Sequence, residues 1–372
     1  MTAALDERYM RRAIDLAERA RGLTSPNPMV GAVIVRDGVV VGEGFHAAAG
    51  RPHAEIEALA AAGSRARGAT LYVTLEPCAH QGRTPPCAPA VVAAGIRRVV
   101  FAVADPNPMV DGRGRRVLEA AEVSVTSGVL EAEAARQNRV FLTAMRAGRP
   151  HVTLKAAITV DGKLADRHGA SRWITGEPAR REAHRLRSES DAIVVGLGTV
   201  LADDPALTVR LDQPWPREPY RVVLDTQART PPGARFITSG KPSRALIAVG
   251  RGAPAERVGA LEATGAEVVP VTAEEGRIDV RALLATLHAR EVRGVLVEGG
   301  GEVHAAFLEA ALVDRVAVFV APRLLGGRTA PSLIGGRGAE LKSAPRLDAL
   351  SVRAVGDDLL IEADVVRSAG DD

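Results

Sequence analysis

Three residues in the first quarter of the chain have the types and spacing of zinc ligands. His53 is followed by Pro77-Cys78 and then by Cys87. One imidazole and two thiolates supply three ligands of a tetrahedral zinc ion. They leave the fourth position to water, as catalytic zinc sites do. Zinc lowers the pKa of such a water towards neutrality, which produces hydroxide at physiological pH.

A carboxylate two residues after the proposed imidazole ligand completes the pattern. Glu55 is placed to carry protons from water to a departing amine, and His-x-Glu followed by Pro-Cys is typical of zinc deaminases. Pro52 and Pro77 each precede a proposed ligand at an expected helix start, where the helix dipole favours a thiolate. The sequence therefore predicts hydrolytic deamination.

The spacing of the two cysteines leaves an alternative open. Eight residues separate Cys78 from Cys87, whereas the general deaminase pattern is Cys-x-x-Cys. His80 lies in this insert and is a candidate fourth ligand of a closed structural site. Glu55 favours the catalytic interpretation, because a purely structural zinc site has no use for it.

Signals in the second half of the chain are weaker. Gly299-Gly300-Gly301 follows an apolar strand and precedes a helix expected over 303–311. A glycine turn that opens a helix binds phosphate through its free N–H groups and the helix dipole. The dinucleotide fingerprint Gly-x-Gly-x-x-Gly is absent, so the turn alone is equally consistent with a simple tight turn. Lys155, on an expected strand, and a predicted loop over 199–210 with an Asp pair add polar groups.

The elements that must position the zinc residues alternate between helices and strands. A helix is expected over 6–21, then a loop at Ser25-Pro26-Asn27-Pro28, and a hairpin around Asp37-Gly38. Further helices are expected over 52–62, 88–94, 114–121 and 129–147, and further strands over 71–75, 99–103 and 123–127. This alternation predicts a sheet covered by helices on both faces.

A second series of strands begins after Gly148-Arg149-Pro150, which we take as the domain boundary between 1–148 and 149–372. Its strands are expected over 151–157, 192–196, 221–225, 245–249, 294–298 and 315–320. A last pair is expected near 350–355 and 358–364. Residues 368–372 are expected to be a disordered tail.

Composition excludes several classes of protein. Apolar residues form 46% and charged residues 25% of the 372 positions, as in an ordinary soluble globular protein. Positive charges are interspersed with acidic ones, and aromatic residues form only 3%, which argues against a nucleic-acid-binding face. No apolar run approaches the ~20 residues of a membrane span, and the N-terminus lacks a signal sequence, so we expect a cytoplasmic protein.

Four segments make the similarity to one family specific. They are Pro26–Gly31, Gly42–His46, Pro52–Glu55 and Thr74–Cys87, the last reading TLEPCAHQGRTPPC. Together they resemble the bifunctional deaminase/reductase family of riboflavin biosynthesis, in which the long insert between the cysteines is the norm. The resemblance covers essentially the whole chain. It implies a cytidine-deaminase-like three-layer α/β/α domain followed by a dihydrofolate-reductase-like α/β domain.

The resemblance also implies the reactions and the cofactors. The substrate would be 2,5-diamino-6-ribosylamino-4(3H)-pyrimidinone 5′-phosphate. One zinc ion per chain would support its deamination, and NADPH would then reduce the ribosyl group to ribityl. The residues implied to bind the deaminase substrate are Asn27, His46, His80, Arg83, Thr84, Asp105 and Asn107. Arg suits phosphate and Asn suits a base edge.

For the reductase, the resemblance implies cofactor contacts at Ala157, Trp173, Thr199, Asp203, Thr226, Gly300, Gly301, Glu302, Val303, His304, Ala305 and Ala306. Substrate contacts would be Ser171, Arg187, Leu207, Arg210 and Glu298. Lys155 and Asp203 are our candidates for polar groups near hydride transfer. A homo-oligomer, dimeric or tetrameric, is expected.

Other hypotheses remain open from the residues alone. The first is a zinc deaminase acting on RNA or on another nucleotide. The second is a deaminase whose C-terminal half only binds nucleotide or mediates assembly. The third is a zinc-stabilised interaction protein. For His46, His80, Asp105, Asn107, Trp173, Arg187, Arg210 and Asp203, ordinary structural roles compete with the functional ones.

Overall fold

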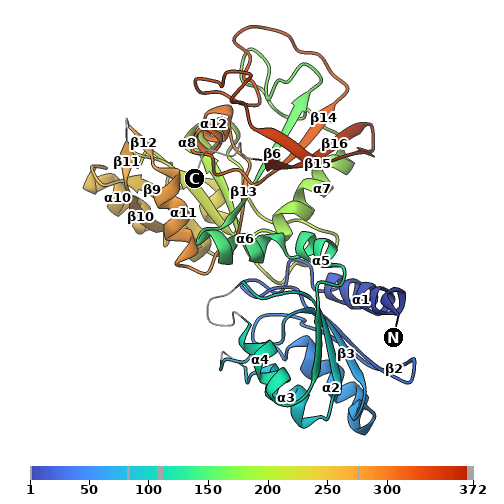
Figure 1. The fold of residues 1–372 in the computed structure, drawn as a ribbon. Coiled ribbons are helices and arrows are strands. Elements are labelled where there is room, and N and C mark those ends of the chain that lie inside the picture. The colour runs from blue at the N-terminus through green and yellow to red at the C-terminus, as the bar shows by residue number, and fades with distance from the viewer. Residues whose placement is uncertain (1, 82–83, 107–111, 275, 367–372) are drawn as a thin grey trace. The chain divides into compact units, whose positions relative to one another are not determined.

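The computed structural model describes residues 2–81, 84–106, 112–274 and 276–366. The chain separates into two compact units, Met1–Gly148 and Arg149–Asp372. Each unit has its own sheet, seen in Figure 1, and each is described by itself. No helix of these described ranges is both long enough and apolar enough to cross a membrane.

The first unit is built on a five-stranded sheet with the order β2-β1-β3-β4-β5. Its strands are β1 (Gly31–Arg36), β2 (Val39–Phe45), β3 (Thr70–Leu75), β4 (Arg98–Val103) and β5 (Ser124–Ser127). Its helices are α1 (Ala3–Glu18), α2 (Ala54–Ala62), α3 (Cys87–Ala93), α4 (Arg113–Ala120), α5 (Glu131–Gln137) and α6 (Arg139–Ala147), with a 3-10 turn at Gly63–Ala66.

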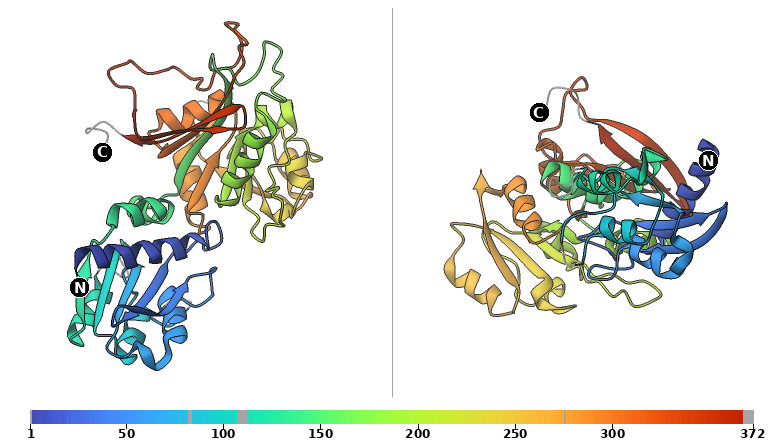
Figure 2. Two further views of the ribbon diagram at one scale, coloured as in Figure 1. Left: turned by 90° about the vertical axis from the view of Figure 1, so that its right-hand side faces the viewer. Right: turned by 60° about the horizontal axis from the view of Figure 1, so that its bottom comes forward.

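Two close approaches define the layers of this unit. A Cβ on Gly31 would lie 2.0 Å from the Ala13 carbonyl oxygen of α1, and a Cβ on Gly44 would lie 2.5 Å from the Ala54 carbonyl oxygen of α2. Gly44 pairs with Ala32, the neighbour of Gly31, so the two glycines point to opposite faces. Helices α1 and α2 therefore cover opposite faces of the sheet, and Figure 2 shows α1 lying across the strands.

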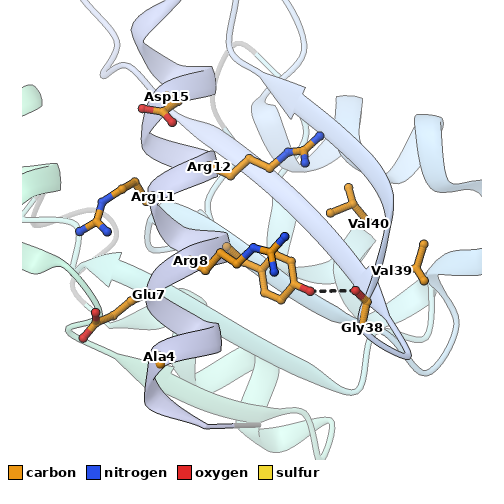
Figure 3. Close-up of a pocket in the computed structure, with 10 residues that line it drawn as sticks. Ala4, Glu7, Arg8, Arg11, Arg12, Asp15, Gly38, Val39 and Val40 are labelled. Atoms are coloured by element: carbon orange, nitrogen blue, oxygen red, sulfur yellow. Dashed lines mark hydrogen bonds between the residues drawn. The ribbon is translucent and has the colours of Figure 1, made fainter.

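Helix α1 is also tied to the β1–β2 hairpin. The Tyr9 hydroxyl donates a hydrogen bond of 2.8 Å to the Gly38 carbonyl oxygen (Figure 3). Asp37 and Gly38 both have positive φ, 50° and 78°, which confirms the predicted Asp-Gly turn. Beside the turn is an open groove of about 740 Å³ lined by Arg8, Arg11 and Arg12.

The second unit is built on a nine-stranded sheet with the order β10-β9-β8-β7-β13-β6-β14-β16-β15. Its strands are β6 (His151–Thr159), β7 (Ala192–Gly196), β8 (Tyr220–Leu224), β9 (Ala245–Gly250), β10 (Glu267–Val271), β13 (Gly294–Val297), β14 (Arg315–Ala321), β15 (Arg346–Val355) and β16 (Asp358–Val366). The strands from β10 to β14 are parallel, and β16 and β15 complete the sheet in antiparallel pairs.

Helices bury both faces of this sheet. They are α7 (Glu177–Ser188), α8 (Leu197–Asp203), α9 (Arg235–Thr238), α10 (Ala255–Glu262), α11 (Val280–His288) and α12 (Gly301–Glu309). A 3-10 turn lies at Pro242–Arg244, and a small ribbon joins β11 (Ala273–Glu274) and β12 (Arg277–Ile278). On β7, Val194 packs into one apolar cluster, and Ile193 and Val195 pack into another on the opposite face. Both faces of this sheet are therefore buried.

Three local expectations were wrong. Residues 129–147 form two helices, because Asn138 leaves helical geometry and its amide bonds both the N–H and the carbonyl of Met29 at 2.8 Å. Residues 199–203 belong to α8 and not to a loop. Cys78 lies in a loop, so Pro77 does not open a helix; Pro86 does, at Cys87. The expected tail over 368–372 lies outside the described residues.

Candidate active sites

One edge of the first sheet gathers the predicted zinc residues. Strands β3 and β4 are parallel and end at this edge, just before Cys78 and Asp105. Strand β1 runs antiparallel to β3 and begins here, while β2 ends here beside it. Segments far apart in sequence therefore converge on one place, which includes the start of α2 at His53.

His53, Cys78 and Cys87 form the expected ligand cluster. Their ligand atoms all lie within 4.8 Å of one another. His53 Nδ1 is 3.2 Å from Cys87 Sγ and 3.6 Å from Cys78 Sγ. An imidazole nitrogen and two sulfurs on a small triangle fit tetrahedral zinc with one open position. His80, the alternative fourth ligand, is not part of this cluster.

Hydrogen bonds join Cys78 and Cys87. Cys87 is the first residue of α3, and its backbone N–H points to Cys78 Sγ at 3.4 Å. The hydrogen bond with Cys87 is the main reason why the pKa of the Cys78 thiol is lowered, whereas the same bond and burial raise the pKa of Cys87. Cys78 is therefore the first of the two to become the thiolate that a metal needs.

Glu55 lies in the first turn of α2, close to the ligand cluster. Its side chain is buried, with 4% of the residue exposed. Burial, together with the neighbouring Cys78, raises the pKa of Glu55 to about 7. A carboxyl with such a pKa both accepts and releases a proton near neutral pH.

Thr84 contacts the proposed imidazole ligand from behind. Its Oγ1 lies 3.0 Å from His53 Nε2, the nitrogen that faces away from the sulfurs. A ligand histidine commonly donates its second N–H to such a partner, which fixes its tautomer and orientation. Thr84, expected to bind substrate, is thus engaged with His53.

His46 and Asn27 form a short chain of hydrogen bonds. His46 is 2% exposed; its Nδ1 lies 3.0 Å from the Pro52 carbonyl oxygen and its Nε2 lies 3.1 Å from Asn27 Nδ2. Because a carbonyl only accepts, Nδ1 carries the proton and Nε2 accepts from the Asn27 amide. Burial lowers the pKa of His46, which favours this neutral form. The bond leaves Asn27 Oδ1 free to accept from a ligand.

The remaining expected substrate residues have varied environments. His80 Nδ1 is buried and has no hydrogen-bond partner among the described residues. Asp105 is buried two residues after the end of β4. Arg83 and Asn107 lie outside the described residues. The structure thus places Thr84 on His53, and it places the Asn27–His46 pair beside His53, since the ring centres of His46 and His53 are 5.4 Å apart.

Helix α4 fixes the loop that carries Cys78. A Cβ on Gly114 would lie 1.8 Å from the Pro77 carbonyl oxygen, so the helix touches the loop backbone. Glu76 Oε1 also accepts a hydrogen bond of 3.0 Å from the Arg115 backbone N–H. Neither contact was foreseen from the sequence, because a glycine inside a helix carries no signal for what it touches.

In the second unit, three predicted residues form a buried ionic cluster. Arg187 on α7 donates to both oxygens of Glu298, at 2.6 and 2.7 Å. Lys155 Nζ on β6 lies 3.9 Å from Glu298 Oε2. Burial raises the pKa of Glu298, but Arg187 and Lys155 outweigh it and lower that pKa to about 2. The cluster holds two cations and one carboxylate where β13 ends beside the middle of β6.

His184, one helical turn before Arg187, belongs to the same place and was missed. Its two ring nitrogens lie 3.2 Å from the backbone nitrogen and from Nε of Arg210. Burial and the nearby Arg187 lower the pKa of His184 to about 4. Its spacing of three from Arg187 on α7 was the available signal, since residues at i and i+3 share a helix face.

The glycine turn after β13 opens helix α12, as expected. Gly300 has φ 54°, which favours glycine, and it stands at the N-cap position of the helix. A Cβ on Gly300 would lie 3.6 Å from Thr199 Oγ1 of α8. The helix N-terminus and Thr199 therefore lie side by side at the carboxyl ends of β13 and β7. His304 is buried one turn further on, with Nδ1 2.9 Å from the Leu333 carbonyl oxygen.

Of the other expected reductase residues, Ser171 and Asp203 bond to each other, whereas Trp173 is exposed. Ser171 Oγ donates to Asp203 Oδ1 at 2.9 Å, and Leu207, with φ 52°, is buried close to this segment in sequence. Trp173 is 59% exposed, with the Arg180 guanidinium 4.7 Å from its ring centre. An exposed indole is available to a ligand. The alternative interpretation of Trp173 as a core residue does not agree with this exposure.

Ala157 lies on β6, whereas Thr226 lies just after β8. Ala157 pairs with Phe319 on β14. Thr226 follows β8, and its carbonyl accepts from Gly250 at the end of β9. The expected cofactor residues therefore extend along one edge of the sheet, from β6 to β8.

Comparison with protein families gives one match in each unit of the chain. Residues 3–103 match the cytidine and deoxycytidylate deaminase zinc-binding region, and residues 150–361 match the RibD C-terminal domain. The chain is 44% identical to the riboflavin biosynthesis protein RibD of Bacillus amyloliquefaciens, covering 96% of both chains. It is 43% identical to that of Escherichia coli, covering 96% of this chain and 98% of the relative.

Solved structures resemble the fold over its whole length. Acinetobacter baumannii RibD has a TM-score of 0.90 at 38% identity, covering 98% of this chain and 100% of that one. A deaminase/reductase from Thermotoga maritima has a TM-score of 0.84 at 35% identity, covering 98% and 99%. The expected fold class, a deaminase-like domain followed by a reductase domain, is confirmed.

These likenesses establish an enzyme with a hydrolytic and a reductive activity, which uses zinc in the first and NADPH in the second. The chain belongs to the RibD family, the bifunctional deaminase/reductases of riboflavin biosynthesis.

Proposed function

We propose that residues 1–148 deaminate 2,5-diamino-6-ribosylamino-4(3H)-pyrimidinone 5′-phosphate and that residues 149–372 reduce the product. The observation that carries the proposal is the cluster of His53, Cys78 and Cys87 with buried Glu55 in the next helix turn. The Thermotoga maritima relative is described as a diaminohydroxyphosphoribosylaminopyrimidine deaminase and a reductase of the resulting uracil, which supports these substrates.

In the deaminase site, His53, Cys78 and Cys87 would hold the metal. Zinc bound there supplies a Lewis acid that lowers the pKa of water. Glu55 takes a proton from the attacking water and delivers it to the departing amino group, so that ammonia leaves and a carbonyl replaces it. Its pKa of about 7 suits both steps.

Contacts with the pyrimidine and the ribose phosphate fall to residues around the cluster. Asn27 presents Oδ1 as an acceptor because His46 occupies its amide N–H. His80, with a buried unpaired nitrogen, and buried Asp105 are proposed as further substrate contacts. Arg83 and Asn107 are proposed from the sequence alone. For Thr84 and His46, the bonds to His53 and Asn27 favour a positioning role.

In the reductase site, NADPH supplies the hydride. Its phosphates are proposed to lie on the N–H groups of Gly300–Ala306, with Ala157, Trp173, Thr199, Asp203 and Thr226 as further contacts. Arg187, Glu298, Arg210, Ser171 and Leu207 are proposed to bind the substrate. Lys155, buried beside Glu298, is proposed to hold a proton near the carbon that accepts hydride.

A coupled assay tests both activities. The diaminopyrimidine phosphate is supplied, and ammonia release and NADPH oxidation are followed separately. Glu55→Gln should abolish ammonia release yet still oxidise NADPH when given the deaminated intermediate. Lys155→Met should show the reverse. Loss of both activities in either variant, or of neither in both, would contradict the assignment.

We further infer a cytoplasmic homo-oligomer, dimeric or tetrameric, without nucleic-acid or membrane partners. Strand β15 ends the nine-stranded sheet and exposes Leu347, Leu350 and Val352. A long apolar edge strand of this kind favours pairing with another chain. Light scattering on the purified protein should give two or four times the chain mass of 39.0 kDa.

A further inference from the structure

Three arginines gather where β8 and β9 end. Arg229 follows β8, Arg251 follows β9 directly, and Arg257 lies in the first turn of α10. Arg229 and Arg257 line one cavity of about 370 Å³, whose other walls are Ala228, Thr230, Pro231, Pro232, Ala260 and Leu261. All three arginines are exposed. Strand β9 and helix α10 lie next to each other in Figure 1.

The three arginines at the ends of β8 and β9 have no acidic partners in the described part of the chain. Among the described residues, Arg229, Arg251 and Arg257 form no ion pair, whereas the second unit pairs Arg149 with Asp314 and Arg217 with Asp191. Arg257 Nη1 makes only a long contact, 3.4 Å, to the Gln227 carbonyl oxygen. Surface arginines without partners leave a local excess of positive charge.

Two carboxylates lie close to this cluster in sequence. Asp225 is 1% exposed, and one of its oxygens accepts from the backbone N–H and the hydroxyl of Thr230, at 2.6 and 2.7 Å. Glu256 is exposed next to Arg257. The segment therefore carries three exposed guanidinium groups and two carboxylates, one of which is buried, so its exposed charge is positive.

The proposed cofactor site fixes which part of the cofactor reaches this cluster. The polar groups for hydride transfer, Lys155 and Glu298, lie at β6 and β13. The glycine turn after β13 takes the central phosphates, so the adenosine half extends in the other direction, past β7 and β8. Parallel strands end at one edge about 4.8 Å apart, and β9 is three strands from β13, about 14 Å.

We propose that Arg229, Arg251 and Arg257 bind the 2′-phosphate that distinguishes NADPH from NADH. Thr226, an expected cofactor contact, is linked to this cluster through the backbone. Its carbonyl accepts from the N–H of Gly250, the neighbour of Arg251, and Arg257 contacts the carbonyl of the next residue, Gln227. A guanidinium fork matches a phosphate dianion in shape and charge. The proposal rests on the proposed reductase function.

Direct binding tests it without turnover. Isothermal titration of the full-length, zinc-loaded protein measures the affinities of NADP⁺, NAD⁺, 2′-AMP and 5′-AMP. We expect the wild type to prefer NADP⁺ over NAD⁺ and 2′-AMP over 5′-AMP. Each change Arg229→Ala, Arg251→Ala or Arg257→Ala should weaken NADP⁺ by about tenfold, and the triple variant should bind both dinucleotides equally. Affinity for NAD⁺ should stay unchanged, which also shows that the site is folded.

Lys241→Ala is the matched control. Lys241 is an exposed cation before β9, at the opposite end of that strand, so its loss changes net charge equally. It should leave the preference for NADP⁺ intact. The inference is overturned if the triple variant still prefers NADP⁺ over NAD⁺, or if the wild type shows no such preference. Neither result contradicts the proposed reductase function. A wild type that binds neither dinucleotide overturns the proposed reductase site as well.

Discussion

Arg187 and Glu298 form a bidentate ion pair in the interior of the second unit, with side chains 13% and 6% exposed. Both were expected to bind substrate, yet in the structure they are already hydrogen-bonded to each other. The pair connects helix α7 to the end of β13 and also holds Lys155 at 3.9 Å. It is therefore a structural element of the site before any ligand binds.

Removing the charge of Glu298 should destabilise the protein. In Glu298→Gln, two buried cations lose their counter-charge, which costs about 3 kcal/mol when one partner of a buried pair is removed. Urea unfolding at neutral pH measures the change. The control Glu177→Gln removes an exposed partner of Arg181 and should cost less than about 0.5 kcal/mol. Equal losses of unfolding free energy in the two variants would show that burial of the Arg187–Glu298 pair does not increase its contribution to stability.

The same pair should make stability depend on acid. The pKa of Glu298 in the folded protein is about 2, below its ordinary 4.5. A depressed folded-state pKa contributes stability above pH 4.5, and this contribution is lost as the pH falls towards 2. The wild type should therefore lose more stability over this interval than Glu298→Gln, in which the group cannot titrate. If the free energy of unfolding falls equally with pH in the two proteins, the low pKa does not belong to Glu298.

Thr84 should control how tightly zinc is held. Loss of its hydroxyl removes the acceptor of the His53 Nε2–H group, and outer-shell partners of this kind are worth about 10-fold to 100-fold in metal affinity. We expect Thr84→Val to lose about tenfold and Thr84→Ser to retain wild-type affinity. Competition with a chromophoric chelator measures both. Tight binding by the valine variant would show that Thr84 serves the substrate instead.

His46 should act on the substrate only through Asn27. His46→Phe frees the Asn27 amide to rotate, so the KM of deamination should rise by about tenfold with zinc content unchanged. In a double-mutant cycle with Asn27→Ala, the second change should add almost nothing to the first. Fully additive effects would mean that His46 contacts the substrate independently.

The zinc site was largely predictable from sequence, because its ligand types are rare in this chain. Only two cysteines occur, and both join His53. The spacing of eight residues between them could not reveal that Cys87 opens α3 while Cys78 stays in a loop. Pro77 and Pro86 each stand directly before a cysteine, so the local sequence is alike at both places. Only Pro86 precedes a helix in the fold.

The reductase residues were harder to interpret, because ordinary residue types carry that site. The spacing of His184 from Arg187 on α7 was its one local signal, and its contact with Arg210, 26 residues further along the chain, appears only in the fold. The helix over 129–147 appeared continuous because Asn138 tolerates a helix; its break depends on Met29, more than a hundred residues away. Long-range hydrogen bonds of this kind are invisible to local periodicity.

Gly114 lets α4 rest directly on the carbonyl of Pro77, immediately before a metal ligand. There is no room for even one extra methyl group between helix and loop, so Gly114→Ala must displace one of them. A genetic screen for riboflavin auxotrophs should therefore recover changes in α4, a helix that supplies none of the proposed ligands or substrate contacts. Such strains should grow again when extra zinc is added to the medium.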